Sequence, residues 1–175
     1  MKILQQKVSA VRAAVTTAFS CLLIISIAMV ADDASATSMA TGSHGEVLSA
    51  NVTSGIKAGQ AINVTGKGFD PMVGIYVEVC QVVPSGVRPS VCGGGANMSG
   101  SGSASFWISS HPPSYGKGLA IALKKGGKFS VVLKVQPKIG SVDCRTAKCA
   151  IYIRADHLRT QDRTHDIKLP LTFAH

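Results

Sequence analysis

The densest group of ionisable side chains lies between residues 154 and 166. Eight of these thirteen residues are charged or titratable: Arg154, Asp156, His157, Arg159, Asp162, Arg163, His165 and Asp166. Their carboxylates and imidazoles are groups that can ligate a metal ion or move a proton during hydrolysis. However, the spacing does not preorganise ligands along a helix or strand, and no Gly-x-Ser-x-Gly nucleophile motif occurs. We therefore expect no catalytic activity.

The arginines of this segment allow a further interpretation. Arg154, Arg159 and Arg163 could bind a phosphate or carboxylate through paired N–H···O bonds. The interpretation we favour is structural, in which Arg–Asp pairs hold a long loop in one shape. Such pairs contribute little singly and more in a network. Loops at the end of a β-sandwich often bind ligands, so the segment remains a candidate site.

Four cysteines follow the N-terminal region: Cys80, Cys92, Cys144 and Cys149. An even number in an exported chain indicates two disulfides, and four cysteines allow three connectivities. We prefer nearest-neighbour pairing, Cys80–Cys92 and Cys144–Cys149. The four residues between the last two cysteines are enough for the chain to double back. Because no Cys-x-x-Cys motif occurs, we expect neither a zinc site nor another cofactor.

The N-terminus has the organisation of a secretory signal peptide. Lys2, Lys7 and Arg12 precede an apolar run over residues 13–31, and small residues at 34–36 suit cleavage after Ala36. An uncleaved membrane anchor is the alternative, because nineteen residues nearly span a bilayer. We predict a signal peptide over 1–36, a flexible lead over 37–45 and one domain over 46–175.

The exported part is strongly basic. Cleavage after Ala36 leaves 139 residues with 15 basic and 7 acidic side chains, a formal charge of +8. Such a chain is attracted to anionic envelope polymers, lipid headgroups or nucleic acid. The alternative is a monomeric exported protein with a lysine-rich surface, in which edge lysines prevent aggregation.

Alternation of apolar and polar residues predicts a sheet protein. From Cys149 the inward positions are Cys149, Ile151, Ile153 and Ala155, and Ala150, Tyr152, Arg154 and Asp156 face the other way. Similar strands are predicted over 46–53, 61–65, 74–83, 103–109 and 167–173, and a hairpin over 119–123 and 128–135 with a Gly126-Gly127 turn. Pro170 places the last strand at a sheet edge. Short strands without a helical period predict an antiparallel two-sheet sandwich.

Two predicted strands carry aromatic residues on their non-core faces. In 74–83, Tyr76 and Glu78 share a face with Cys80, opposite an apolar face. In 103–109, Trp107 points away from the predicted core side, and it is the only tryptophan. Either an adjoining loop covers Trp107, or the ring lines a ligand cleft or partner surface.

These features resemble the neocarzinostatin and macromomycin family of apo-chromoproteins. Val142-Asp143-Cys144 with Cys149, preceded by Gly140, is similar to the family's second disulfide loop. The 61–68 segment, the Cys80 and Cys92 pair and the 102–105 segment are similar and follow in the same order. The resemblance covers residues 46–173. It implies an immunoglobulin-like β-sandwich of about seven strands with two short-range disulfides, whose named members carry an enediyne chromophore to DNA.

The family's chromophore packs on the first disulfide and on aromatic side chains. Two of those aromatic positions are occupied here by Val82 and Lys134, which removes stacking surface for a flat polycyclic ligand. The resemblance thus gives Val82, Lys134, Trp107 and the Cys80–Cys92 bridge as cleft candidates. We predict a non-catalytic binding protein for another small apolar ligand. The alternatives are an envelope protein that meets anionic polymers or a protein partner, and an enediyne carrier with DNA as its indirect target.

Overall fold

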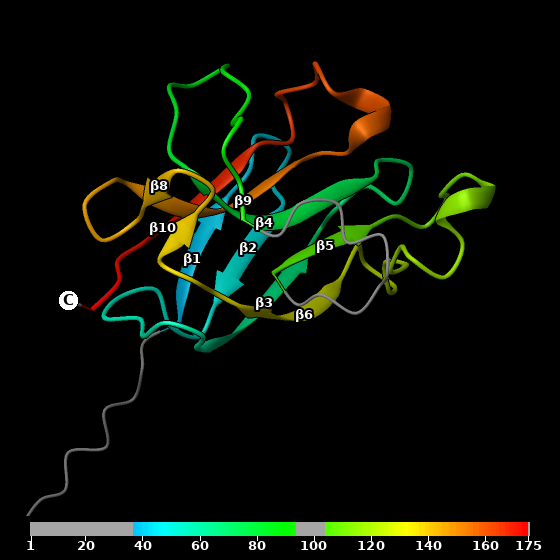
Figure 1. The fold of residues 1–175 in the computed structure, drawn as a ribbon. Coiled ribbons are helices and arrows are strands. Elements are labelled where there is room, and N and C mark those ends of the chain that lie inside the picture. The colour runs from blue at the N-terminus through cyan, green and yellow to red at the C-terminus, as the bar shows by residue number, and fades with distance from the viewer. Residues whose placement is uncertain (1–36, 94–103, 175) are drawn as a thin grey trace, which may run out of the picture. The chain divides into compact units, whose positions relative to one another are not determined.

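The computed structural model describes residues 37–93 and 104–174, so the predicted signal peptide and most of the glycine-rich 93–102 stretch lie outside the described residues. The described chain forms two four-stranded antiparallel sheets (Figure 1). The first has the order β1 (Ser38–Thr41), β2 (Val47–Ala50), β3 (Ala61–Lys67), β6 (Phe129–Lys134). The second has the order β10 (Ile167–Leu171), β9 (Cys149–Ala155), β4 (Ile75–Gln81), β5 (Ser105–Ile108).

Three short elements complete the described part of the chain. A two-stranded ribbon joins β7 (Lys138–Ile139) to β8 (Val142–Asp143). Two 3-10 turns, η1 (Ser114–Gly116) and η2 (His157–Arg159), lie in the connections after β5 and β9. Among the described residues there is no helix with the length and apolar character to cross a membrane.

The inner faces of both sheets share one hydrophobic core, which confirms the predicted β-sandwich. Along β3 every second residue is buried, and β4 and β9 contribute their inward positions to the same cluster. The members without any exposed surface include Leu48, Ile62, Val64, Val77, Leu133, Ile151 and Ile153. Each such side chain stabilises the fold by roughly 1.5–3 kcal/mol through burial. The inner faces are thus filled, and a binding site has to lie elsewhere.

Both predicted disulfides are confirmed. Cys80–Cys92 links the end of β4 to the segment after it, with Cα atoms 4.0 Å apart. Cys144–Cys149 closes the short loop between β8 and β9, with Cα atoms 5.5 Å apart. A bridge of this kind typically contributes about 2–4 kcal/mol. The first bridge also fixes the 82–92 loop, shown in green in Figure 1, against the second sheet.

Two elements differ from the sequence prediction. The 37–45 segment, for which we expected a flexible lead, contains β1, because a turn at 42–45 folds it back onto β2. The prediction of a hairpin between residues 119–123 and 128–135 is wrong. Its turn closes with one bridge between Lys124 and Lys128, but β6 pairs with β3 and Ile121 bridges Ile108.

A close backbone contact explains the lost hairpin. The Phe69 N–H donates to the Gly127 carbonyl oxygen at 3.2 Å, and a Cβ at residue 127 would lie only 2.0 Å from the Phe69 carbonyl oxygen. The turn is therefore packed against the corner after β3, and β6 leaves it along β3. The edge position predicted from Pro170 is confirmed, since β10 is the outermost strand of the second sheet.

Candidate functional site

The outer face of the second sheet presents cross-strand rows of aromatic and charged residues. In one row Trp107 of β5 is opposite Tyr76 of β4, which is opposite Arg154 of β9. In the next row Glu78 lies between Ser105 and Tyr152. Side chains two residues apart share a face of a strand, so adjacent rows form one continuous surface. Strand pairing thus brings an aromatic ring, a carboxylate and a guanidinium together.

One end of this surface is covered by the 82–92 loop. Cys80, Ala150 and Tyr152 are fully buried, and Val82 and Cys92 pack against them. The Tyr152 hydroxyl accepts a hydrogen bond from the Val83 N–H at 3.2 Å. The Val83 carbonyl oxygen in turn accepts one from Lys168 Nζ at 2.8 Å. These contacts hold the loop in place beside the uncovered part of the face.

The uncovered part is a cavity of about 470 Å³. Its volume falls in the range of small-molecule pockets, roughly 300–1,000 Å³. Strand residues form one wall, the loop and the Cys80–Cys92 bridge form another, and η2 closes the side. The lining residues are Tyr76, Glu78, Arg88, Pro89, Ser90, Cys92, Arg154 and His157.

A buried ion pair lies in this pocket. Arg154 Nε donates to Glu78 Oε1 at 2.6 Å, and Glu78 is 3% exposed. Burial raises the pKa of Glu78, and the positive charges of Arg154 and Arg88 offset this only in part. The Arg154 guanidinium also lies over the Tyr76 ring, 4.9 Å from its centroid. Arg154 Nη1 has almost no exposed surface and no hydrogen-bond partner among the described residues, so this donor is unsatisfied and meets a ligand acceptor only if the side chain shifts.

His157 joins two tyrosines at the side of the pocket. The Tyr76 hydroxyl is 2.6 Å from His157 Nδ1, and the Tyr115 hydroxyl is 2.7 Å from His157 Nε2. Both ring nitrogens are therefore engaged, which leaves neither available to a metal ion without breaking a bond. Burial, together with the negative charge of Asp156, raises the pKa of Tyr76. The group functions as an aromatic wall.

Trp107 is held directly behind that wall. Its Nε1 donates to Asp156 Oδ2 at 2.9 Å, and its ring meets His157 edge-on at a centroid distance of 5.0 Å. Asp156 is fully buried. Its side chain also accepts a hydrogen bond from the Leu158 N–H, and this bond caps the start of η2. A Cβ at residue 116 would lie 2.5 Å from the tryptophan ring, so η1 covers Trp107 closely. Trp107 is thus covered by the adjoining segment and is not among the pocket-lining residues, but its ring touches Tyr76 and His157, which are.

The charged segment does not converge on one site. Arg154 lines the pocket, Arg159 Nη1 donates to the Met72 carbonyl oxygen at 3.0 Å, and Arg163 pairs with Asp166 at 3.2 Å. Asp162 accepts from both the N–H and the hydroxyl of Thr164. Of the Arg–Asp pairs that the structural interpretation expects, the described residues of this segment form Arg163–Asp166, and Asp162 is held by Thr164 instead. Arg154, Arg159 and His165 instead contact distant segments, and the His165 contact with Glu46 spans the longest separation of the three.

The remaining cleft candidates lie away from the pocket wall. Val82 packs beneath the loop against the Tyr152 cluster, and Lys134 is exposed in the first sheet, opposite Ala61. Sequence reasoning placed Tyr76 and Glu78 correctly on the non-core face but did not select them. Their shared face with Cys80 was the signal that could have done so. Arg88 gave no local signal, because its position depends on the path of the loop.

Comparison with known proteins gives one family. A model described as the Neocarzinostatin family matches residues 48–168 of this chain. Among solved structures, macromomycin is similar at 19% sequence identity with a TM-score of 0.49, over 74% of this chain and 100% of the macromomycin chain. No curated protein matches.

Proposed function

The chain belongs to the neocarzinostatin family, and we propose that it is a non-catalytic carrier that holds a small molecule in the pocket beside the Cys80–Cys92 bridge. The observation that supports this most strongly is the unfilled cavity lined by Arg154, whose Nη1 has no partner among the described residues. A buried donor without a partner costs about 1–3 kcal/mol, and a ligand oxygen that met Nη1 after a shift of the Arg154 side chain would recover that cost. The protein's own packing fills the core but not this cavity.

The pocket favours a ligand with an apolar ring system and one oxygen acceptor. Tyr76, Pro89 and Cys92 offer apolar surface, while Arg154 and Arg88 offer positive charge. An aromatic carboxylate, phenolate or ring ketone would fit this combination. In place of the aromatic side chains that the resemblance expects at 82 and 134, the pocket offers the rings of Tyr76 and His157, against which Trp107 and Tyr115 pack. An enediyne therefore remains one member of the ligand class that the experiment below tests.

We also propose that the carrier acts outside the cytoplasm. Two disulfides suit an oxidising compartment, and the predicted cleavage after Ala36 would release the domain. Intact-mass measurement of the secreted protein checks this. A mass that begins at Thr37 and includes two bridges is expected, and a retained N-terminal segment would indicate an anchored protein instead.

The direct test is a binding titration that uses the single tryptophan. Trp107 touches Tyr76 and His157, so 2-naphthoate in the pocket should change its fluorescence. Arg154→Lys retains a positive charge beside Glu78 but loses the planar fork, and we expect at least tenfold weaker binding. The matched control is Lys134→Ala, which changes an exposed residue of the other sheet. Native mass spectrometry of the secreted protein would identify the natural ligand.

Two results would contradict the carrier proposal. One is naphthoate affinity that is equal in wild type and Arg154→Lys. The other is the absence of any bound small molecule together with no naphthoate response.

The envelope alternative rests on exposed lysines. Lys117, Lys124, Lys125, Lys128, Lys134 and Lys138 are all exposed. Binding to an anionic polymer through these residues would weaken steeply as salt rises, because the Debye length falls from about 10 Å at 0.1 M to about 3 Å at 1 M. Binding in the pocket should persist at high salt. Sedimentation with anionic cell-wall polymer at both salt concentrations separates the two functions.

A further inference from the structure

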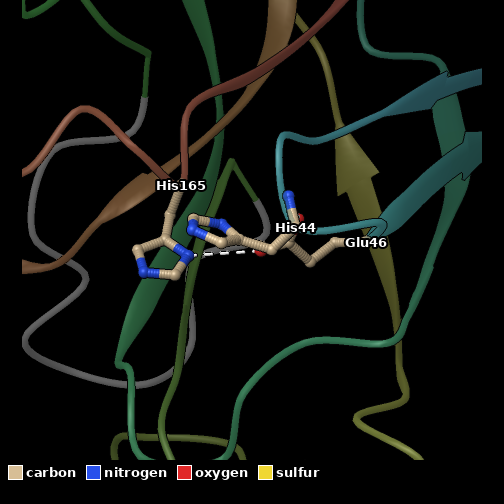
Figure 2. Close-up of side chains that lie close together, drawn as sticks. All are labelled: His44, Glu46 and His165. Atoms are coloured by element: carbon tan, nitrogen blue, oxygen red, sulfur yellow. Dashed lines mark hydrogen bonds and ion pairs between the residues drawn. The ribbon is translucent and has the colours of Figure 1, made fainter.

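Two distant segments bring a second group of ligating side chains together, away from the pocket. The turn between β1 and β2 carries His44 and Glu46, and the loop before β10 carries His165 (Figure 2). One ligand atom from each of the three side chains lies within 4.8 Å of the others. The two imidazole rings are stacked, with centroids 4.8 Å apart.

Glu46 is arranged to present one oxygen to both rings. His44 Nδ1 is 3.3 Å from Glu46 Oε1, and His165 Nδ1 is 3.2 Å from the same oxygen. The other oxygen, Oε2, accepts the backbone N–H of His44 at 3.0 Å. The turn packs closely around this oxygen, because a Cβ in place of the Gly42 hydrogen would lie only 2.6 Å from Oε2. The backbone thus fixes which oxygen faces the histidines.

The Glu46 carboxylate is only 2% exposed. Burial alone would raise the pKa of Glu46, but hydrogen bonds from its own backbone, from His165 and from the His44 N–H outweigh burial and lower it. A buried anion that faces two imidazoles is an arrangement that a cation would complete.

The distances suit a shared metal ion better than a tight ion pair. Zinc binds histidine nitrogen at about 2.0–2.1 Å and carboxylate oxygen at about 2.0–2.2 Å in a tetrahedral arrangement, which places ligand atoms roughly 3.3–3.4 Å apart. The two nitrogen-to-oxygen distances are 3.3 Å and 3.2 Å. A charge-assisted hydrogen bond would be shorter, about 2.7–2.9 Å. The two separations from a histidine nitrogen to Glu46 Oε1 are therefore those of a tetrahedral ion, and the two nitrogens lie within 4.8 Å of each other.

The surroundings orient His165 as a ligand. Its Nε2 is 3.8 Å from Asp162 Oδ2, on the side of the ring away from Glu46. This separation is longer than a hydrogen bond, but the negative charge attracts a proton to Nε2 and so leaves Nδ1 free to coordinate. Ser43 Oγ donates to the Thr164 carbonyl oxygen at 2.5 Å and so ties the turn to the loop. The group is held from both chain segments.

We propose that His44 Nδ1, Glu46 Oε1 and His165 Nδ1 bind one Zn²⁺ ion, with the fourth position left to water. Two imidazoles and one carboxylate favour a borderline cation over Ca²⁺ or Mg²⁺, which prefer oxygen ligands. His44 is half exposed and provides an entry path. The other close group of this kind among the described residues, Glu78 with Cys80 and Cys92, cannot serve, because its sulfurs form a disulfide.

The test is a zinc titration of the secreted chain, produced without a polyhistidine tag and treated with EDTA. We expect one Zn²⁺ per chain by equilibrium dialysis. His44→Ala and His165→Ala should abolish stoichiometric binding, and Asp162→Asn should weaken it about tenfold. The matched control is His111→Ala, an exposed histidine outside the group, which should bind like wild type. Circular dichroism verifies that each variant is folded.

His44→Ala decides the outcome because the His44 side chain is half exposed, so its loss should leave the fold intact. Zinc should also raise the melting temperature of wild type, because an ion that binds only the folded chain stabilises it. That increase should be absent in His44→Ala. Wild type that binds no zinc, or a His44→Ala variant that keeps full affinity, would overturn the proposal.

Discussion

Glu46 and Glu78 are 2% and 3% exposed, but the two carboxylates have opposite chemical surroundings. Glu46 lies beside the exposed His44 and accepts several hydrogen bonds, and its pKa is lowered despite burial. Glu78 lies deep in the pocket against one arginine, and burial raises its pKa. The direction of a pKa shift at a buried carboxylate thus depends on how many donors accompany the loss of water.

The different partners of Glu46 and Glu78 also determine which kind of ligand each of the two regions can bind. At Glu46 the carboxylate faces two imidazole nitrogens, so the missing partner is a cation. At Glu78 the carboxylate is satisfied by Arg154 Nε, and the unpaired atom is the donor Nη1. The missing partner there is an acceptor. Similar burial therefore produces one region suited to a metal ion and another suited to an oxygen-bearing ligand.

The largest effect should come from removal of Arg154, the cation that is hydrogen-bonded to Glu78. Arg154→Met leaves Glu78 buried without its partner, and removal of one member of a buried pair costs about 3–5 kcal/mol. The equivalent change at the other region, His165→Ala, removes one of several partners and should cost about 1–2 kcal/mol. Urea denaturation at pH 7 measures both losses. Equal losses of unfolding free energy in the two variants would show that the hydrogen-bond donors around Glu46 do not make it less dependent on a single partner than Glu78 is.

A smaller effect should follow removal of the bridge beside the pocket. The Cys80→Ala/Cys92→Ala double variant should lose about 2–4 kcal/mol in free energy of unfolding. Naphthoate affinity should fall, because the bridge holds the 82–92 loop that forms one wall. Zinc affinity should remain unchanged, since no contact of the Glu46 group involves that loop among the described residues. Titration of the same preparation with both probes makes the comparison, and a parallel loss of both affinities would contradict it.

The smallest effect is a dependence of stability on pH that belongs to Glu78. Its folded pKa lies above the ordinary value of 4.5, so between the two values the native state binds more protons than the unfolded state. Stability should therefore fall as pH rises through that window and level off above it. The slope cannot exceed about 1.4 kcal/mol per pH unit for one group. Urea denaturation between pH 4 and 8 should show this slope in wild type and its loss in Glu78→Gln; an unchanged slope would assign it to another group.

Local pattern was sufficient for much of the fold. The period of two along 149–156 and 61–65 predicted which side chains enter the core, and cysteine spacing favoured the two bridges. It failed for β1, because Ser38–Thr41 is short and mostly small or polar, and it is a strand only because β2 offers its edge. It also failed where Gly127 packs against Phe69 and diverts a predicted hairpin.

The binding regions could be predicted only in part, because long-range pairing assembles them. Alternation placed Tyr76, Trp107 and Arg154 on outer faces one strand at a time, but only the strand register aligns them in one row. Val82 and Lys134 came from correspondence with the family and lie outside the pocket lining. His165 contacts Glu46 across a separation of 119 residues, which no local pattern could indicate.

The cavity is lined by two kinds of residues, strand residues on its floor and loop residues on its rim, and only the second kind can be changed freely to alter the ligand. Its floor consists of side chains of β4 and β9, where Arg154 bonds to Glu78 and lies over Tyr76. Residue 74, just before β4, must stay glycine because a Cβ there would lie 1.9 Å from Asp156 Oδ2. Its rim consists of loop residues, and Arg88 and Ser90 are exposed. Substitutions on the rim can therefore retune which molecules are accepted while the floor preserves the sandwich, and a library for new cargo specificity belongs at those two positions.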